Sequence, residues 1–120
     1  MPHVTIEYSS NLEDGVSVRR LVDELHKSVV DSGLFDLSAI RTRALPRAVY
    51  RIADGNPYNV FLHIIARIRA GRSVEDRKKL GNALLQTAKA ALCANSRPIA
   101  LGVEIHEIDP EMLFRHITIK

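Results

Sequence analysis

One stretch near the middle of the chain, residues 60–68, is almost continuously apolar and rich in β-branched side chains. Only His63 and Arg67 interrupt it, and it is far shorter than the run of about 20 apolar residues that crosses a bilayer. Such a stretch is typical of a β-strand that is buried on both faces. The sequence therefore predicts a sheet in which this strand is central and has both faces covered.

Two other segments, residues 3–8 and residues 99–108, show the alternation of polar and apolar residues that is typical of half-buried strands. A third segment, over residues 40–52, is expected to be extended. Pro46 lies within the last of these and cannot donate a hydrogen bond to a neighbouring strand. We therefore expect this strand to be broken or bulged at Pro46 and to resume at Ala48.

Two helices are predicted between these strands, each with an apolar stripe at helical spacing. Ser17 is a suitable N-cap for the first helix, and Gly33 provides its stop. Ser73 and Asp76 resemble a capping box at the start of the second helix, which should continue to about Asn95. The elements thus follow the order strand, helix, strand twice.

This order predicts an α+β fold with one domain over residues 1–120 and pseudo-repeats at about 1–55 and 58–120. We expect a four-stranded mixed sheet with both helices on one face. Two helices cover only one side of such a sheet, whereas the strand at residues 60–68 calls for burial on both sides. Self-association is the simplest way to cover the second face.

The basic residues are mostly arginines and gather between residues 41 and 77, although the formal net charge is only +3. Such a cluster can contact nucleic-acid phosphates, bind small carboxylates in a bidentate manner, or simply form a solvated face. A nucleic-acid-binding module of ferredoxin-like topology is therefore one alternative. Aromatic residues, which stack on bases, make up only 5% of the chain, and this argues against that alternative.

The N-terminus lacks the basic region and the apolar stretch of a secretory signal, and Cys93 is the only cysteine. We therefore expect a cytoplasmic protein without an internal disulfide and without a membrane partner. Cys93 lies among small and apolar residues of the second helix, which predicts a buried thiol with no chemistry. The five histidines show neither His-x-x-x-His spacing nor cysteine partners, so we expect no metal site.

Pro2 directly precedes the first predicted strand. If Met1 is removed, Pro2 carries a secondary amine at a fixed place in the sheet. An α-amino group has a pKa of about 8 in peptides, and burial beside cations lowers that pKa toward neutrality, where general-base catalysis is most effective. A retained Met1 would leave a non-basic amide instead. A proline in this position can also simply start a strand.

Several short motifs occur in a fixed order from the N-terminus to the second helix. They are Met1-Pro2-His3, Glu7-Tyr8-Ser9-Ser10-Asn11, Gly33-Leu34-Phe35, Ala39-Ile40-Arg41-Thr42-Arg43, Ala53-Asp54-Gly55 and Ala70-Gly71-Arg72-Ser73. Each motif is weak by itself. Together they resemble the 5-carboxymethyl-2-hydroxymuconate isomerase family of the tautomerase superfamily, over nearly the whole chain and only loosely in the C-terminal tail.

The resemblance implies a homotrimeric isomerase without a cofactor, which moves a proton within a small unsaturated dicarboxylate or tricarboxylate. It implies Pro2 as the catalytic base and Arg41 and Arg72 as catalytic and substrate-binding residues. Arg43 should point to the same face as Arg41, where it is either a further substrate-binding residue or a salt-bridge partner. The implied substrate is 5-carboxymethyl-2-hydroxymuconate, an intermediate of homoprotocatechuate breakdown. A tautomerase that acts on another small enol or keto acid is the alternative within the same fold.

Overall fold

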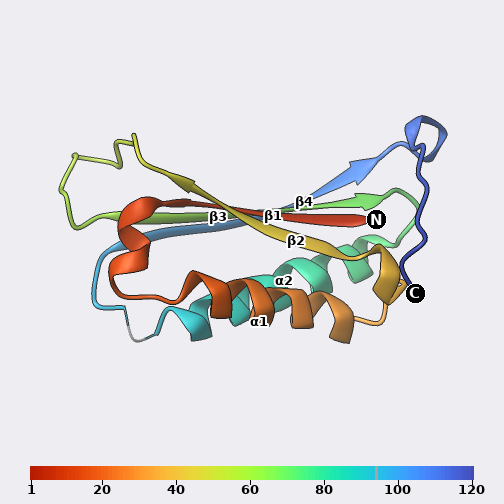
Figure 1. Ribbon diagram of the computed structural model, residues 1–120, viewed down its shortest axis with the longest axis horizontal. Helices are drawn as coiled ribbons and strands as arrows, with labels where there is room; N and C mark the ends of the chain where they lie inside the picture. Colours follow the sequence, from red (N-terminus) through yellow and green to blue (C-terminus); the bar gives the residue numbers. More distant parts are fainter. Residues whose placement is uncertain (94) are drawn as a thin grey trace.

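The computed structural model describes residues 1–93 and 95–120. One four-stranded sheet carries two helices, which lie next to each other on the same face (Figure 1). The elements in chain order are β1 (Pro2–Ser9), α1 (Val18–Asp31), β2 (Arg41–Arg47), β3 (Val60–Arg69), α2 (Val74–Ala91) and β4 (Ile99–Ile108), with short 3-10 helices η1 (Ser10–Asp14), η2 (Leu37–Ala39) and η3 (Pro110–Met112).

The sheet is mixed, with the strand order β2-β1-β3-β4. β1 pairs with β2 in parallel, and β3 pairs with β4 in parallel, because a helix crosses over between the two strands of each pair. The two central strands, β1 and β3, are antiparallel. The predicted α+β architecture, with a four-stranded mixed sheet and two helices, is therefore confirmed.

The core lies between the sheet and the helices. Alternate residues of the two central strands are fully buried, among them Ile6 of β1 and Ile64 of β3. Each helix contributes one apolar stripe at helical spacing. The buried stripe residues are Leu21, Leu25 and Val29 of α1 and Leu80, Leu84 and Ala88 of α2.

The predicted helix ends are present. The Ser17 hydroxyl accepts a hydrogen bond from the backbone N–H of Arg20, and the Ser73 hydroxyl accepts one from the N–H of Asp76. Gly33, just beyond α1, has a φ of 69°, a backbone conformation that is unfavourable for most other residues. Local sequence signals thus correctly located the start of both helices and the end of the first.

One strand prediction needs correction, and another is confirmed in part. β2 runs through Pro46 and ends at Arg47, and residues 48–52 form no strand. Proline fits here because β2 is an edge strand, so its nitrogen does not need to donate to a neighbour on the outer side. β3 is central, as predicted, and its helix-facing side is buried. Phe61, His63 and Ile65 on the other face are half-buried within one chain, and the self-association expected to cover them stays a prediction.

The end of the second helix was also predicted incorrectly. α2 ends at Ala91 instead of continuing to about Asn95, and the part of the predicted helix at Ala94 lies outside the described residues. Cys93 follows the helix end and is exposed, so the prediction of a buried thiol is wrong. None of the helices in the described part of the chain is long and apolar enough to cross a membrane.

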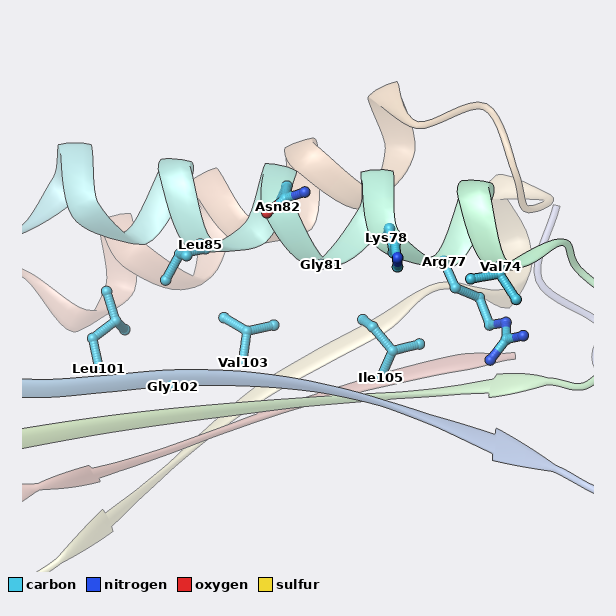
Figure 2. Close-up of a pocket in the computed structure, with 10 residues that line it drawn as sticks. All are labelled: Val74, Arg77, Lys78, Gly81, Asn82, Leu85, Leu101, Gly102, Val103 and Ile105. Atoms are coloured by element: carbon cyan, nitrogen blue, oxygen red, sulfur yellow. The ribbon is translucent and has the colours of Figure 1, made fainter.

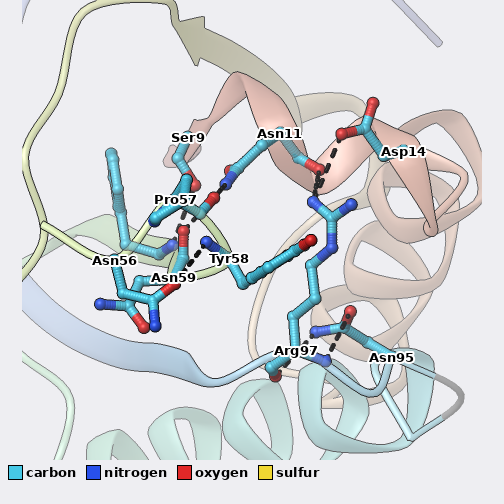
Figure 3. A network of polar contacts seen from close by, with 10 residues as sticks. Ser9, Asn11, Asp14, Asn56, Pro57, Tyr58, Asn59, Asn95 and Arg97 are labelled. Atoms are coloured by element: carbon cyan, nitrogen blue, oxygen red, sulfur yellow. Dashed lines mark hydrogen bonds and ion pairs between the residues drawn. The ribbon is translucent and has the colours of Figure 1, made fainter.

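A network of hydrogen bonds links the loops at the end of the sheet where β1 finishes and β3 begins (Figure 3). The side-chain amide of Asn11 donates to the carbonyl of Asn59 at 2.8 Å and to that of Pro57 at 3.3 Å. Arg97 donates to the Asn11 carbonyl at 3.0 Å and to the Asp14 carboxylate at 3.3 Å. The loop before β3, η1 and the loop before β4 are thereby tied together.

Candidate active site

The start of β1 lies at the opposite end of the sheet from this network. Pro2 is paired with Ile68 near the end of β3, and His3 is paired with Arg41 at the start of β2. Pro2 is buried. Three segments that are far apart in the sequence therefore meet around the N-terminus, which in Figure 1 lies at the end of the sheet where β3 finishes.

Arg41 is half-buried next to the first residue of the chain. Its Nη1 donates to the Met1 sulfur at 3.3 Å, and a thioether is a weak acceptor. The adjacent Thr42 is fixed by a 2.8 Å hydrogen bond between its hydroxyl and His26 Nδ1 on α1. This bond holds the start of β2 against the helix layer and thereby sets the position from which Arg41 extends.

Arg43 shares a sheet face with Arg41, as predicted, because the two are paired with alternate residues of β1. Its Nη1 donates to His3 Nδ1 at 3.1 Å, so in this contact His3 is neutral with its proton on Nε2. Burial lowers the pKa of His3, and the nearby charges of Arg43 and Arg41 lower it further. Arg43 is exposed and contacts a histidine here, which does not match the salt bridge considered from the sequence.

Arg72 lies in the loop that leads from β3 into α2, and its guanidinium group is held from several sides. Nη2 donates to the carbonyl of Leu34 at 2.8 Å, and Nη1 donates to that of Arg69 at 3.3 Å. The guanidinium also stacks on the ring of Phe35, 4.4 Å from its centroid. The Gly33-Leu34-Phe35 and Gly71-Arg72-Ser73 motifs are therefore in direct contact in the fold.

The amino group at the chain start lies in a positive field. Burial lowers the pKa of the Met1 amino group below its ordinary value of 8.0, and the charges of Arg115, Arg41 and Arg72 lower it further. Asp36 acts in the opposite direction. Arg41 and Arg72, which were predicted from the sequence, thus act on this point together. Arg115 was missed, because it lies in the loosely matching tail and no local motif includes it.

A separate groove of about 630 Å³ lies between α2 and β4 (Figure 2). Its apolar wall includes Leu101, Val103 and Ile105, while Arg77 at its end is paired with Glu107 at 3.1 Å. It includes neither Pro2 nor the arginines that act on the N-terminus, and its lining residues include no histidine and no carboxylate. We therefore place the candidate site at the start of β1, where the groups with catalytic chemistry meet.

Cofactor and metal ligands are a separate question for this site. Within residues 1–93 and 95–120, no group of three or more His, Cys, Asp or Glu side chains is arranged to hold a metal ion. The charges that act on the N-terminus are instead mostly cationic, with Asp36 as the one carboxylate among them, and this suits a bound carboxylate. The arrangement can therefore combine an amine base with groups that bind and stabilise negative charge.

Known proteins with a similar sequence or structure agree with this assignment. The sequence model that matches residues 2–120 describes 5-carboxymethyl-2-hydroxymuconate isomerase. The 5-carboxymethyl-2-hydroxymuconate Delta-isomerase of Escherichia coli is 32% identical over 96% of this chain and 93% of its own. The crystal structure of a 5-carboxymethyl-2-hydroxymuconate isomerase from Deinococcus radiodurans R1 is 30% identical, covers 98% of this chain and 90% of its own, and superimposes with a TM-score of 0.91.

More distant solved structures share the fold alone. The fused 4-OT wild type symmetric trimer has a TM-score of 0.67 at 21% identity, covers 89% of this chain and 85% of its own, and shares the fold. The isomerase family, by contrast, is matched along almost the whole chain in both sequence and structure. The chain therefore belongs to the 5-carboxymethyl-2-hydroxymuconate isomerase family.

Proposed function

We propose that this protein is a cofactor-free Δ-isomerase of 5-carboxymethyl-2-hydroxymuconate, with the amine of Pro2 as its catalytic base. Removal of Met1 converts the Pro2 nitrogen from an amide into a secondary amine. The observation that carries the proposal is geometric: Pro2 is buried at the start of β1, and its neighbour His3 is paired with Arg41 of β2. Burial, followed by the charges of Arg115, Arg41 and Arg72, lowers the pKa of the Met1 amino group at the same place. A lowered pKa leaves more of an amine in its neutral, basic form at neutral pH.

The proton transfer follows from the structure of the substrate. The amine removes the proton of the 2-hydroxyl group, and the resulting dienolate becomes a ketone at that carbon. The double bonds shift along the chain, and the amine returns the proton to the far end of the conjugated system. The net change is an isomerisation, in which one proton moves and no oxidant or reductant takes part.

The arginines stabilise negative charge in this sequence of steps. The dienolate places new charge beside the carboxylates that the substrate already carries, and fixed guanidinium groups can bind both. Arg72 is suited to this role because its contacts with Leu34 and Phe35 hold it in one position before the substrate binds. Arg41 is suited because its contact with Met1 is lost when Met1 is removed, which frees its donors.

The same proposal includes a homotrimer and a cytoplasmic location. The sheet face without helices carries the half-buried apolar side chains of Phe61 and Ile65, which a second copy would cover. The fused 4-OT protein that shares this fold is a symmetric trimer, and this supports three copies rather than two. Light scattering of the purified protein measures the number of copies directly, and a monomer across the working concentrations would contradict this part.

The function can be tested with processed protein whose Met1 removal is confirmed by intact mass. The decrease in the ultraviolet absorbance of 5-carboxymethyl-2-hydroxymuconate reports its isomerisation. We expect protein that retains Met1, in which the Pro2 nitrogen is a non-basic amide, to have a kcat lower by about 100-fold or more, the usual contribution of a positioned base. Pro2→Ala replaces the secondary amine with a primary amine and should lower kcat by less. Arg41→Gln and Arg72→Gln should lower kcat/KM by about 10- to 1,000-fold, as expected for charge-stabilising groups.

Arg19→Gln is a matched control, because Arg19 is an exposed arginine on α1 that forms an ion pair with Asp23 at 3.5 Å, away from the start of β1. It should leave the rate within about twofold of the wild type, as surface substitutions usually do. Wild-type protein that is processed and folded but does not isomerise the compound would overturn the assigned substrate. Other small enol acids, and then nucleic acid, would be the next ligands to examine.

A further inference from the structure

His3 follows the proposed base directly and lies in a cationic part of the sheet. It alternates along β1 with the buried residues Pro2 and Val4, so its side chain lies on the sheet face that carries no helices. The strand register pairs His3 with Arg41 of β2 on one side and with Arg67 of β3 on the other. Paired residues of neighbouring strands share a sheet face, so His3 lies between two arginines at the start of the chain.

A contact with Arg43 fixes the protonation of the His3 ring. Arg43 Nη1 lies 3.1 Å from His3 Nδ1. A guanidinium group can only donate, so Nδ1 must be the acceptor, and the one proton of the ring is then on Nε2. A protonated imidazole has no acceptor and cannot make this contact. Burial, and after it the charges of Arg43, Arg41, the N-terminus and Arg67, lower the pKa of His3, in agreement with a neutral ring.

The remaining N–H of His3 is free to bind a ligand. In the described part of the chain, the side-chain hydrogen bond of His3 is the one with Arg43, and no acceptor takes its Nε2–H. Glu7 and Glu104, the strand carboxylates on the same sheet face, already accept hydrogen bonds from other side chains, at 2.8 and 3.1 Å. A carboxylate that binds His3 and Arg41 together would therefore come from another molecule.

Resting on the proposed function, we infer that His3 is a further substrate-binding residue, which donates its Nε2–H to a substrate carboxylate beside Arg41, and that Arg43 positions it by keeping it neutral. Arg43 then serves substrate binding through His3 instead of by direct contact. A neutral donor suits this place, because it binds an anion without adding a further cation beside the arginines and the terminal amine. It also leaves the amine as the group whose titration controls the rate.

Nuclear magnetic resonance of processed, 15N-labelled protein tests the role of Arg43 without any substrate. The nitrogen shifts of an imidazole show which nitrogen carries the proton, and His3→Gln identifies the His3 signals by their loss. We expect a neutral His3 with its proton on Nε2 at about pH 7, and a pKa below the ordinary 6.5. Arg43→Gln should raise this pKa and allow the other tautomer, whereas Arg43→Lys, which keeps a cationic donor, should change both less.

Kinetics of the isomerisation test the role of His3 itself, with Arg19→Gln again as the control. In His3→Gln the side-chain amide places an N–H close to the position of Nε2–H, whereas in His3→Asn the amide reaches only the position of Nδ1. His3→Asn should raise KM by about tenfold and change kcat by less than about threefold, as expected for a lost hydrogen bond to a charged group. His3→Gln should recover most of this loss. Arg43→Gln should make KM fall at a higher pH than in the wild type, because a protonated His3 binds a carboxylate more strongly.

The outcomes separate this inference from the proposed function. Equal losses in His3→Asn and His3→Gln, or no loss in either, would overturn the role of His3, while wild-type turnover still supported the isomerase. A wild-type His3 that is protonated on Nδ1 at about pH 7, or an unchanged His3 pKa in Arg43→Gln, would overturn the role of Arg43. Processed wild type without turnover would overturn the proposed function and substrate binding by His3, but not the resonance result for Arg43. Circular dichroism and light scattering of every variant exclude a folding or assembly defect.

Discussion

Replacing Arg72 should lower the stability of the fold as well as the activity, because its side chain holds two loops together. Its guanidinium joins the loop before α2 to the segment after α1, through the Leu34 carbonyl and the Phe35 ring. Both motifs that carry the family resemblance in this region depend on this contact. In Arg72→Ala the hydrogen bonds and the stacking are lost together.

The cost can be worked out from the individual contacts. The 2.8 Å bond to Leu34 involves a charged donor at a half-buried carbonyl, and we take the lower end of the range for such bonds, about 1.5 kcal/mol. A cation stacked on a partly exposed ring contributes about 0.5–1 kcal/mol. The 3.3 Å bond to the Arg69 carbonyl is exposed and adds little. Arg72→Ala should therefore lower the free energy of unfolding by about 2 kcal/mol, and Arg72→Lys, which keeps the charge, by about 1 kcal/mol.

Urea unfolding at one fixed protein concentration measures these values, since the stability of an assembled protein depends on concentration. Arg69→Ala is the control, because Arg69 is an exposed arginine three residues earlier, and its change should stay within about 0.5 kcal/mol. An Arg72→Ala protein as stable as this control would refute the idea that Arg72 holds the loop. Activity loss in that protein would then be attributable to substrate binding alone.

Three further outcomes follow from named contacts. Asn11→Ala removes two hydrogen bonds to loop carbonyls and should cost about 1–2 kcal/mol in urea unfolding. Hydrogen bonds from His106 and His63 hold the pKa of Glu104 below its ordinary value of 4.5. The contribution of Glu104 to stability is therefore present above that pH and is lost as the pH falls through the lowered pKa. Glu104→Gln should remove this loss from a measurement of stability against pH in acid. The rate should rise with pH as the Pro2 amine loses its proton, and neutralising either proposed catalytic arginine should move this rise to higher pH, because both arginines lower the pKa of the amino group at the chain start.

The fold could be predicted largely from the sequence because its signals are local. Apolar spacing and the hydroxyls of Ser17 and Ser73 are enough to locate both helices. The errors arose where the outcome depends on neighbours in space. Pro46 is tolerated in β2 only because that strand lies at the edge of the sheet, and an edge position is a property of the whole topology.

The candidate site was predictable only in part, for the same reason. Pro2, Arg41 and Arg72 stand in recognisable motifs, but nothing in those motifs shows that Arg72 stacks on Phe35. Arg115 lies in a segment without a strong pattern, and its proximity to the N-terminus depends on where η3 turns the chain. Contacts between distant segments require the folded topology, and a single sequence supplies only the residues that could make them.

The two ends of the sheet show why the charges at one of them are best explained by function. β1 and β3 are antiparallel, so each begins at the end of the sheet where the other finishes. Where β3 begins, Arg97 bonds the Asn11 carbonyl and the Asp14 carboxylate, and its charge serves to hold loops together. Where β1 begins, the contact of Arg41 within the described residues is with the Met1 thioether, and its charge disfavours the protonated form of the terminal amine. Like charges that lie close together destabilise the folded protein. Selection for folding alone would therefore favour arginines paired as Arg97 is, at both ends of the sheet. An enzyme that must keep an amine neutral and bind a multiply charged anion requires arginines placed as Arg41 is, beside the amine at the start of β1.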